Sequence, residues 1–294
     1  MTTATAWADE DLGDWRYKFN NARTQCIITA YLGNKNVTFL VIPKVYRAEN
    51  SNENIPVIDV TATFTDCPNL KTLYFFEDTQ IQGMPDMQGC TNFKAIHLCT
   101  SYNENNAIGI NRMGTITSTD NTLPSSMTNI YNSFRGTNIE TLNMPNVTSI
   151  GNRAFEGCNS LTSVTFGQAA SIESNGYQST VFSKIGSKCT VTYPGSMANW
   201  SCYDYQYSPN LVINCTDGSC GWCGDGWSSG MELYQNASCL YWTLDNSGNL
   251  TIDCVPQDII YNNYLSKQII RTQKWNKAKV KSLTLKNVYS FSNR

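Results

Sequence analysis

Charged side chains are scarce in this chain. Lys, Arg, Asp and Glu make up 15% of its 294 residues, and the formal net charge is −2 at pH 7. The densest basic run, residues 274–286, is interleaved with apolar residues, which favours a solvated strand over a groove for phosphates. A nucleic-acid partner is therefore not expected, and solubility must depend on the many Asn, Ser and Thr side chains.

Histidine occurs once, at position 97, which limits the possible chemistry. A Ser-His-Asp triad would have to use His97, and no Gly-x-Ser-x-Gly elbow accompanies it. No Gly-rich phosphate loop and no carboxylate pair at a meaningful spacing is present either. We therefore expect no enzyme, no catalytic residues and no cofactor, and we expect His97 to lie on a solvated strand face.

Long apolar runs are also missing. No stretch approaches the ~20 residues that a membrane-spanning helix needs. The segment 1–14 does not combine a basic start with an apolar stretch, so it does not predict a secretory signal peptide. Either such a peptide was removed and replaced by a start codon, or the protein leaves the cell by another route.

Cysteine, in contrast, is abundant, with 12 residues. Cys67, Cys90 and Cys158 occupy one position of the repeat described below, where they would be free, small, buried hydrophobes. Six others fall between residues 202 and 254, a density that favours disulfides in an oxidising compartment.

The pair Cys220-Gly-Trp-Cys223 leaves three alternatives. Disulfides to nearby cysteines are favoured. A zinc site could recruit Cys202, Cys215 or Cys239, but a second Cys-x-x-Cys is missing. A redox dithiol would need a strand-to-helix setting, which the Gly-rich surroundings do not provide. No metal site is therefore predicted.

A repeat organises the middle of the chain. Its clearest copy, residues 147–168, carries apolar residues at Ile150, Phe155, Cys158, Leu161, Val164 and Phe166. Leu73 and Ile96 are 23 residues apart, and Leu142 and Val164 are 22 apart. Because 46 residues separate Ile96 from Leu142, one degenerate or looped-out unit is expected between them. Such units need stacked neighbours to bury their apolar faces.

The pattern Ile-Gly-x-x-Ala-Phe-x-x-Cys-x-x-Leu-x-x-Val-x-Phe resembles the BspA-like leucine-rich repeats of bacterial surface proteins. The resemblance covers residues 55–194, and strand patterns near 15–19 and 27–31 are similar to the β-rich lead-in of these proteins. It implies a repeat solenoid, with a parallel β-sheet on the concave face and short helical or turn segments on the convex face.

Three regions are expected. Residues 1–46 would form a β-rich N-terminal cap, and residues 47–200 the leucine-rich-repeat solenoid. Residues 201–294 would form a Cys- and aromatic-rich connector and a small C-terminal β module. Because the repeat period is lost after Tyr193, we expect residues 225–294 to pack as a separate β unit that does not continue the same sheet.

Alternation along the repeat strands predicts which side chains face the core. Two columns should point inward: Leu73, Ile96, Leu142, Val164 and Val191, and Phe75, Leu98, Met144, Phe166 and Tyr193. The outward column between them should bind the ligand: Tyr74, His97, Asn143, Thr165 and Thr192. Tyr74 is the expected anchor, because tyrosine offers a large contact area at a small entropy cost. Alternatively, binding lies in the loop 99–125, or the face is only solvated.

The resemblance implies a non-enzymatic, adhesin-like extracellular protein. It would present its concave sheet to a protein or glycan ligand on a host or cell surface or in the matrix. The alternative is a structural or receptor-binding component of a virion or secreted assembly, suggested by Met1 without a signal peptide, the low charge and the polar composition. The expected location is accordingly extracellular or the cell surface, or else the virion surface.

Overall fold

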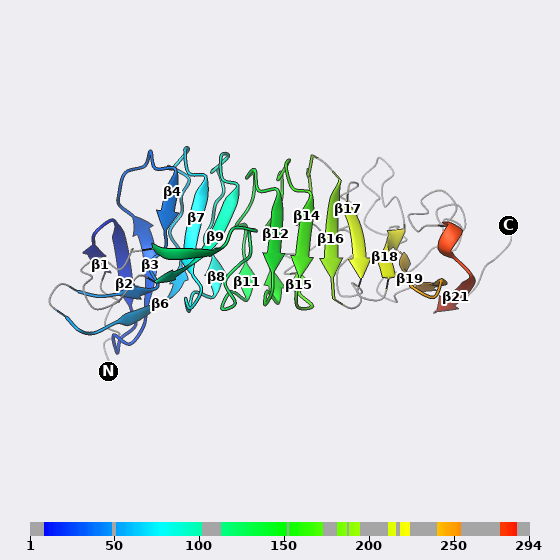
Figure 1. Cartoon of the computed structure of the whole chain (residues 1–294), viewed down its shortest axis with the longest axis horizontal. Coiled ribbons are helices and arrows are strands. Elements are labelled where there is room, and N and C mark those ends of the chain that lie inside the picture. Colours follow the sequence, from blue (N-terminus) through cyan, green and yellow to red (C-terminus); the bar gives the residue numbers. More distant parts are fainter. Residues whose placement is uncertain are drawn as a thin grey trace, which may run out of the picture.

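The regular secondary structure of the described residues is almost entirely β-strand, with the strands stacked as successive coils of the chain (Figure 1). The computed structural model describes residues 9–48, 51–101, 113–151, 153–172, 181–186, 188–194, 211–215, 218–223, 240–253 and 277–286. Within these ranges no helix is long and apolar enough to cross a membrane. Two ladders of short parallel strands run along the stack, and apolar side chains fill the space between them.

The first ladder has one strand from each coil. Its strands are β4 (Phe39–Val41), β7 (Thr72–Phe76), β9 (Ala95–Ser101), β12 (Thr141–Met144), β14 (Ser163–Phe166), β16 (Cys189–Tyr193) and β17 (Leu211–Cys215). Neighbours pair in parallel in two groups, β4–β7–β9 and β12–β14–β16–β17. Leu142 lies opposite Val164, and Val164 opposite Val191, as predicted for the first inward column.

The second ladder was not expected. It consists of two-residue strands: β8 (Gly83–Met84), β11 (Asn129–Ile130), β13 (Ser149–Ile150) and β15 (Ser171–Ile172), paired in parallel. Short helical or turn segments were expected opposite the parallel sheet, but Ile150 lies in β13, and a turn follows at residues 153–157. Pairing with neighbouring coils satisfies the backbone groups that a helix would otherwise satisfy internally. In the part of the chain that the structure describes, turns and short strands occupy the side on which short helical or turn segments were expected.

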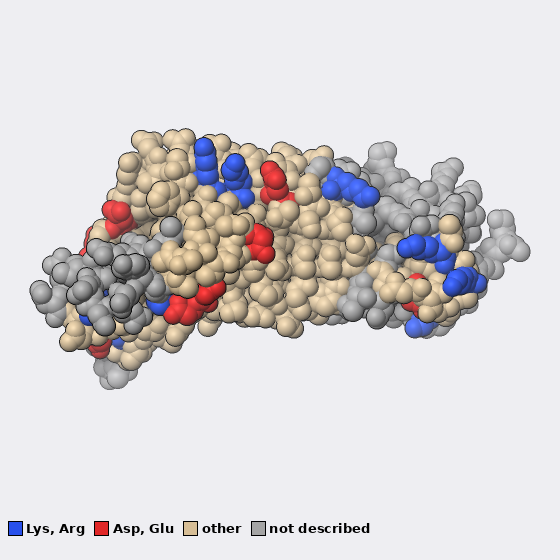
Figure 2. Space-filling model, viewed as in Figure 1, with Lys and Arg blue, Asp and Glu red and all other residues tan. Residues whose placement is uncertain are grey.

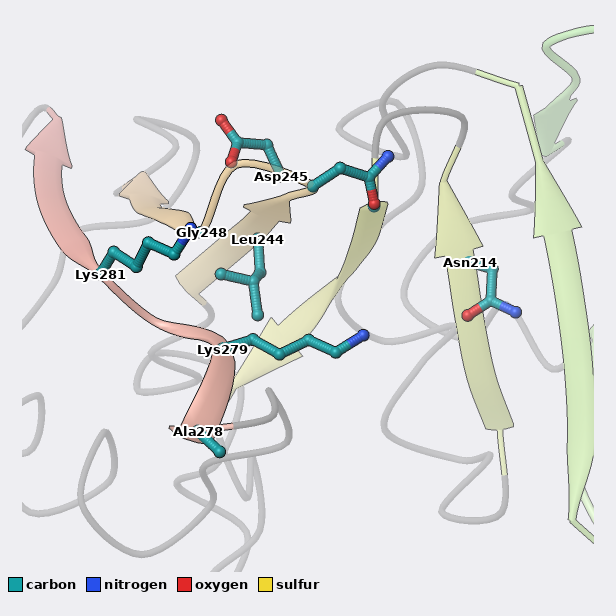
Figure 3. A pocket seen from close by; sticks show the side chains of 9 residues that line it. Asn214, Leu244, Asp245, Gly248, Ala278, Lys279 and Lys281 are labelled. Carbon is teal, nitrogen blue, oxygen red and sulfur yellow. The ribbon is translucent and has the colours of Figure 1, made fainter.

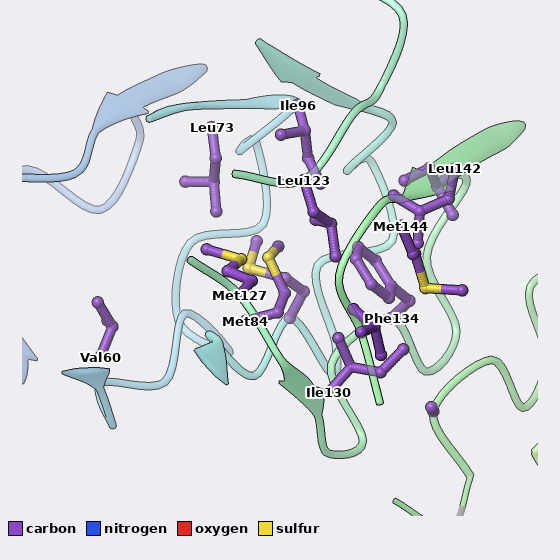
Figure 4. Close-up of a cluster of buried hydrophobic side chains, with 14 of the residues drawn as sticks. Val60, Leu73, Met84, Ile96, Leu123, Met127, Ile130, Phe134, Leu142 and Met144 are labelled. Atoms are coloured by element: carbon purple, nitrogen blue, oxygen red, sulfur yellow. The ribbon is translucent and has the colours of Figure 1, made fainter. Parts of the chain in front are cut away.

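The inward columns confirm the predicted register. Leu73, Ile96, Leu142, Val164 and Val191 are each at most 2% exposed. In the second column four of the five side chains are at most 3% exposed, and Leu98 is half-buried against the core. Figure 4 shows part of this core, in which Leu123, Met127 and Ile130 continue it between the coils of Ile96 and Leu142.

Stacked rings line the turns that close successive coils. The ring centroids of Phe134 and Phe155 are 5.5 Å apart, and those of Phe155 and Phe182 are 5.0 Å apart, with nearly parallel planes. Backbone bonds join the same turns, from Phe134 N to Ala154 O (3.0 Å) and from Phe155 N to Val181 O (2.9 Å). The coils therefore stack in register on this side too.

The unit expected between Ile96 and Leu142 is looped out. Strand β10 (Met113–Ser118) comes after β9 in the sequence and pairs with it antiparallel. Residues 121–123 then lie between β9 and β12. On the turn side the coils before and after this insertion are direct neighbours, because Met87 N donates to Ser133 O and Asn138 N to Phe93 O. The insertion therefore divides the first ladder into two sheets.

A five-stranded sheet covers the N-terminal end. Its order is β1–β2–β3–β6–β5, formed by β1 (Asp9–Leu12), β2 (Trp15–Phe19), β3 (Cys26–Tyr31), β6 (Ile55–Val60) and β5 (Val45–Tyr46). The indole of Trp15 packs edge-on against Phe64 of the first coil. Strands on either side of residue 46 connect the cap to the array. Strand β4, before this residue, pairs with β7 of the array, and β6, after it, pairs with β3 of the cap sheet.

The C-terminal strands continue the array sheet. Strands β18 (Gly218–Cys223), β19 (Leu240–Asp245) and β20 (Asn249–Asp253) follow β17 antiparallel, and β21 (Ser282–Lys286) pairs in parallel with β20. The prediction that residues 225–294 do not continue the same sheet is therefore wrong. Pairing with β18 satisfies the edge of β17, which would otherwise be exposed.

Candidate functional site

The five predicted ligand-binding residues lie in one row of the first ladder. Tyr74 is in register with His97, Asn143 with Thr165, and Thr165 with Thr192. The inserted segment divides the row into an aromatic part with Tyr74 and His97 and a polar part with the other three. Thr122 pairs with Asn143 and Asn214 with Thr192, and these two residues extend the polar part beyond the prediction.

The aromatic part contains a third ring that the sequence analysis did not include. The ring of Phe39 meets Tyr74 edge-on, with centroids 5.9 Å apart, and Tyr74 meets His97 edge-on at 5.0 Å. Phe39 is 55% exposed, an unusual value for a large apolar side chain. It was missed because its strand was assigned to the cap, although Phe39 itself alternates with the buried Leu40.

His97 is less solvated than expected. It is half-buried beside Tyr74, and its Nδ1 is shielded from solvent without a hydrogen-bond partner among the described residues. Burial lowers its pKa below the ordinary value of 6.5, since desolvation disfavours the charged imidazolium. His97 therefore lies on the outward face as expected, partly exposed, with one ring nitrogen shielded from solvent.

The polar part of the row is free of charged residues. Its Asn143 amide donates to the Thr122 hydroxyl at 3.3 Å, Thr165 is half-buried, and Thr192 is exposed. A parallel outward row contains Thr141, Ser163 and Thr190, which are in register with one another. The surface over β12, β14 and β16 shows few charges (Figure 2). This arrangement offers short hydroxyl and amide groups on a fixed backbone.

A cavity of about 480 Å³ lies at the end of the row. Asn214 lines it together with residues of the C-terminal strands: Gly218, Leu244, Asp245, Asn246, Gly248, Ala278, Lys279 and Lys281 (Figure 3). Asp245 already accepts hydrogen bonds from the backbone N and the side-chain amide of Asn249, at 2.8 and 2.7 Å. The Asp245 carboxylate is thus already engaged in hydrogen bonds within its own turn.

The predicted free cysteines are confirmed. Cys67, Cys90 and Cys158 are free and buried, as are Cys26, Cys99 and Cys189. Cys220 is disulfide-bonded, whereas the pairing of the other cysteines between 202 and 254 stays a prediction. Cys202 and Cys239, two of the suggested zinc ligands, lie outside the described residues. Among the residues that are described, no group of three or more His, Cys, Asp or Glu could hold a metal ion.

The sequence matches the family model of the BspA type leucine rich repeat region in six copies, over residues 58–183 and 113–211. Together these matches span just over half of the chain. The chain therefore belongs to the BspA-type leucine-rich-repeat family and has a leucine-rich-repeat type of fold. Proteins with such repeats generally serve as non-enzymatic scaffolds for binding other proteins.

Solved structures of bacterial leucine-rich-repeat proteins are similar to the chain. A leucine-rich-repeat protein of T. pallidum has 16% identity and a TM-score of 0.42, over 70% of this chain and 81% of its own. A leucine-rich cell surface protein of Faecalibacterium prausnitzii has 12% identity and a TM-score of 0.42, over 85% and 62%. A Bacteroides ovatus leucine-rich-repeat protein has 17% identity and a TM-score of 0.38, over 63% and 47%. No curated protein matches the sequence.

Proposed function

We propose that this chain is a non-enzymatic extracellular binding protein, adhesin-like, whose outward row is the concave face of a leucine-rich-repeat solenoid. Its ligand is a protein or glycan on a host or cell surface or in the matrix. One observation carries the proposal: an uncharged row of aromatic, amide and hydroxyl side chains follows the first ladder from Tyr74 to Asn214. Family membership supports a binding role, and the cell-surface relative suggests the location.

Within this proposal the two parts of the row have different tasks. Tyr74 anchors the ligand together with the exposed ring of Phe39, because aromatic rings bury a large area at a small entropy cost. Asn143, Thr165 and Thr192 orient it through hydrogen bonds, and His97 keeps the Tyr74 ring in place through their edge-to-face contact. Backbone pairing holds every one of these strands, so little ordering is needed on binding.

The alternative of a virion component finds no support in these relatives. The matching family and the similar structures are bacterial leucine-rich-repeat proteins, one of them from a cell surface. A binding protein of this class therefore remains the single proposal.

The test uses a Tyr74→Ala, Asn143→Ala double variant and a panel of extracellular-matrix proteins and host glycans. If the wild type binds a member of the panel, we expect the double variant to bind it roughly tenfold or more weakly, as expected for loss of an aromatic anchor. Gln88→Ala, an exposed polar change outside this row, serves as the matched control. Equal affinities of the double variant and the wild type would show that the row is not the binding surface.

A further inference from the structure

A cluster of charges lies on the turn side of the stack, away from the outward row. The carboxylate of Glu156 is only 9% exposed, and three cations surround it. Lys184 Nζ lies 2.8 Å from Glu156 Oε1, and Arg135 Nε and Arg153 Nε lie 3.1 and 3.6 Å from Oε2. One carboxylate neutralises one of these charges, so the cluster keeps two surplus positive charges.

The cations come from three successive coils. Arg135 follows Phe134, Arg153 and Glu156 flank Phe155, and Lys184 belongs to the turn of Phe182. Because the Phe rings repeat every 5.5 and 5.0 Å, the cations form a short row along the stack. Their side chains remain open to solvent, with 33% exposure for Arg135, 48% for Arg153 and 76% for Lys184.

Lys184 occupies a backbone position at which neighbouring turns have glycine. Gly136 N donates to Glu156 O, and Gly157 N donates to Ser183 O, so Gly136, Gly157 and Lys184 take equivalent places in successive turns. All three have positive φ, at +69°, +73° and +56°. Glycine adopts this conformation freely and lysine rarely does. The fold alone thus favours glycine at position 184, and the lysine side chain must be useful for another reason.

Arg153 is in the same situation. It and Asn132 accept equivalent backbone bonds, from Glu156 N and Arg135 N, and both have positive φ, at +64° and +48°. Asparagine tolerates this region, whereas a long basic side chain seldom occurs there. Two of the three basic residues therefore have a backbone conformation that long basic side chains rarely adopt.

We propose that Arg135, Arg153 and Lys184 bind oxyanion groups, sulfate or carboxylate, carried by a linear polyanionic glycan. Arginine and lysine form short, charge-assisted hydrogen bonds with such oxygens. The buried Glu156 holds the three side chains together before the ligand arrives, which reduces the ordering cost of binding. A nucleic acid fits less well, because two surplus charges on a chain of net charge −2 do not make a basic groove.

The site shares no residue with the outward row, so the two proposals can fail independently. The experiment measures binding of the whole chain to immobilised heparin and to desulfated heparin by surface plasmon resonance, at several NaCl concentrations. We expect heparin to bind, with an affinity that falls as salt rises. Comparison with the desulfated polymer, which keeps its carboxylates, separates sulfate recognition from carboxylate recognition.

Two variants remove a cation without disturbing the turn. Lys184→Gly and Arg153→Asn install the residues that neighbouring turns have at these places, and each should weaken heparin binding roughly fivefold or more. Each variant loses one ion pair with Glu156 but relieves a positive φ, so we expect melting temperatures close to that of the wild type. Circular dichroism at the assay temperature checks that both variants are folded. Lys94→Ala, at an exposed lysine outside this cluster, should bind like the wild type.

Three results would overturn the proposal. The first is absence of wild-type binding to both heparin and the desulfated polymer. The second is unchanged affinity of both Lys184→Gly and Arg153→Asn. The third is equal affinity for a single-stranded DNA of the same charge, which would assign the cluster to nucleic acid.

Discussion

The side-chain carbonyl of Asn121 accepts a hydrogen bond from the backbone N–H of Ile96 at 2.8 Å. Asn121 thereby takes the place of a backbone partner at the edge of β9, where the insertion interrupts the ladder. Its own backbone bonds to the other side, since Asn143 N donates to Asn121 O at 3.0 Å. One residue thus joins the two sheets of the first ladder. It is 9% exposed and has a φ of +58°.

Removing this amide should destabilise the array. In Asn121→Gly the positive φ is accommodated but the buried N–H of Ile96 loses its acceptor, so we expect a loss of about 1–3 kcal/mol in the free energy of unfolding. Asn121→Ala should cost about 1 kcal/mol more, because alanine adopts this conformation less readily. Urea denaturation measures both, with Thr192→Ala as the exposed control. Wild-type stability in both variants would show that this bond does not join the sheets.

The sequence predicted the register of the coils well, and the reason is physical. Leu142, Val164 and Val191 each alternate with polar residues along their strands, and a shift by one residue would expose all of them. Asn121 could not be predicted in the same way. It occupies an inward position with a polar side chain, and only the structure shows that its amide bonds to a backbone 25 positions away.

The candidate site was predicted only in part for a related reason. Tyr74 and Asn143 lie on strands of the repeat, so their outward direction follows from alternation. Phe39 comes before the first recognisable repeat, and its pairing with Thr72 depends on a tertiary contact that spacing does not reveal. The continuation of the sheet from β17 to β21 was missed because the period ends at Tyr193, while strand pairing needs no period.

His97 should titrate below the ordinary histidine value. Burial beside Tyr74 lowers its pKa from 6.5, so the folded chain binds this proton at a lower pH than the unfolded chain does. The stability that the neutral imidazole contributes is present above pH 6.5 and is lost as the pH falls through the folded pKa. Because the chain has one histidine, NMR of the imidazole carbons gives this pKa directly.

Tyr74→Ala provides the matched comparison for that titration. Removing the neighbouring ring opens His97 to water, so its pKa should move back toward 6.5. A wild-type value at or above 6.5 would contradict the shielding that the structure shows.

The cysteines of the array should resist alkylation in the native protein. Burial raises the pKa of Cys158 to about 11 and that of Cys90 and Cys189 to about 12, so little thiolate forms at pH 8. Iodoacetamide should modify these three only after denaturation, and Cys220 only after reduction as well. Peptide mass spectrometry at each step reads the result. Rapid native labelling of Cys158, or a free thiol at Cys220 without reduction, would contradict this assignment.

Glu156 should stabilise the turns that close the coils. Burial by itself would raise the pKa of its carboxyl, but the hydrogen bond from Lys184 and the charges of Arg135 and Arg153 hold it below the ordinary 4.5. In Glu156→Gln the three cations lose their shared counter-charge, so we expect a loss of about 1–3 kcal/mol in the free energy of unfolding at pH 7. A lowered pKa stabilises the fold above pH 4.5, and this contribution disappears as the pH falls through the folded value. The difference between wild type and variant should therefore shrink between pH 5 and pH 3 in urea titrations, whereas the exposed Glu140→Gln should show a small difference at every pH. A constant difference for Glu156→Gln would mean that its charge is not what holds the three coils together.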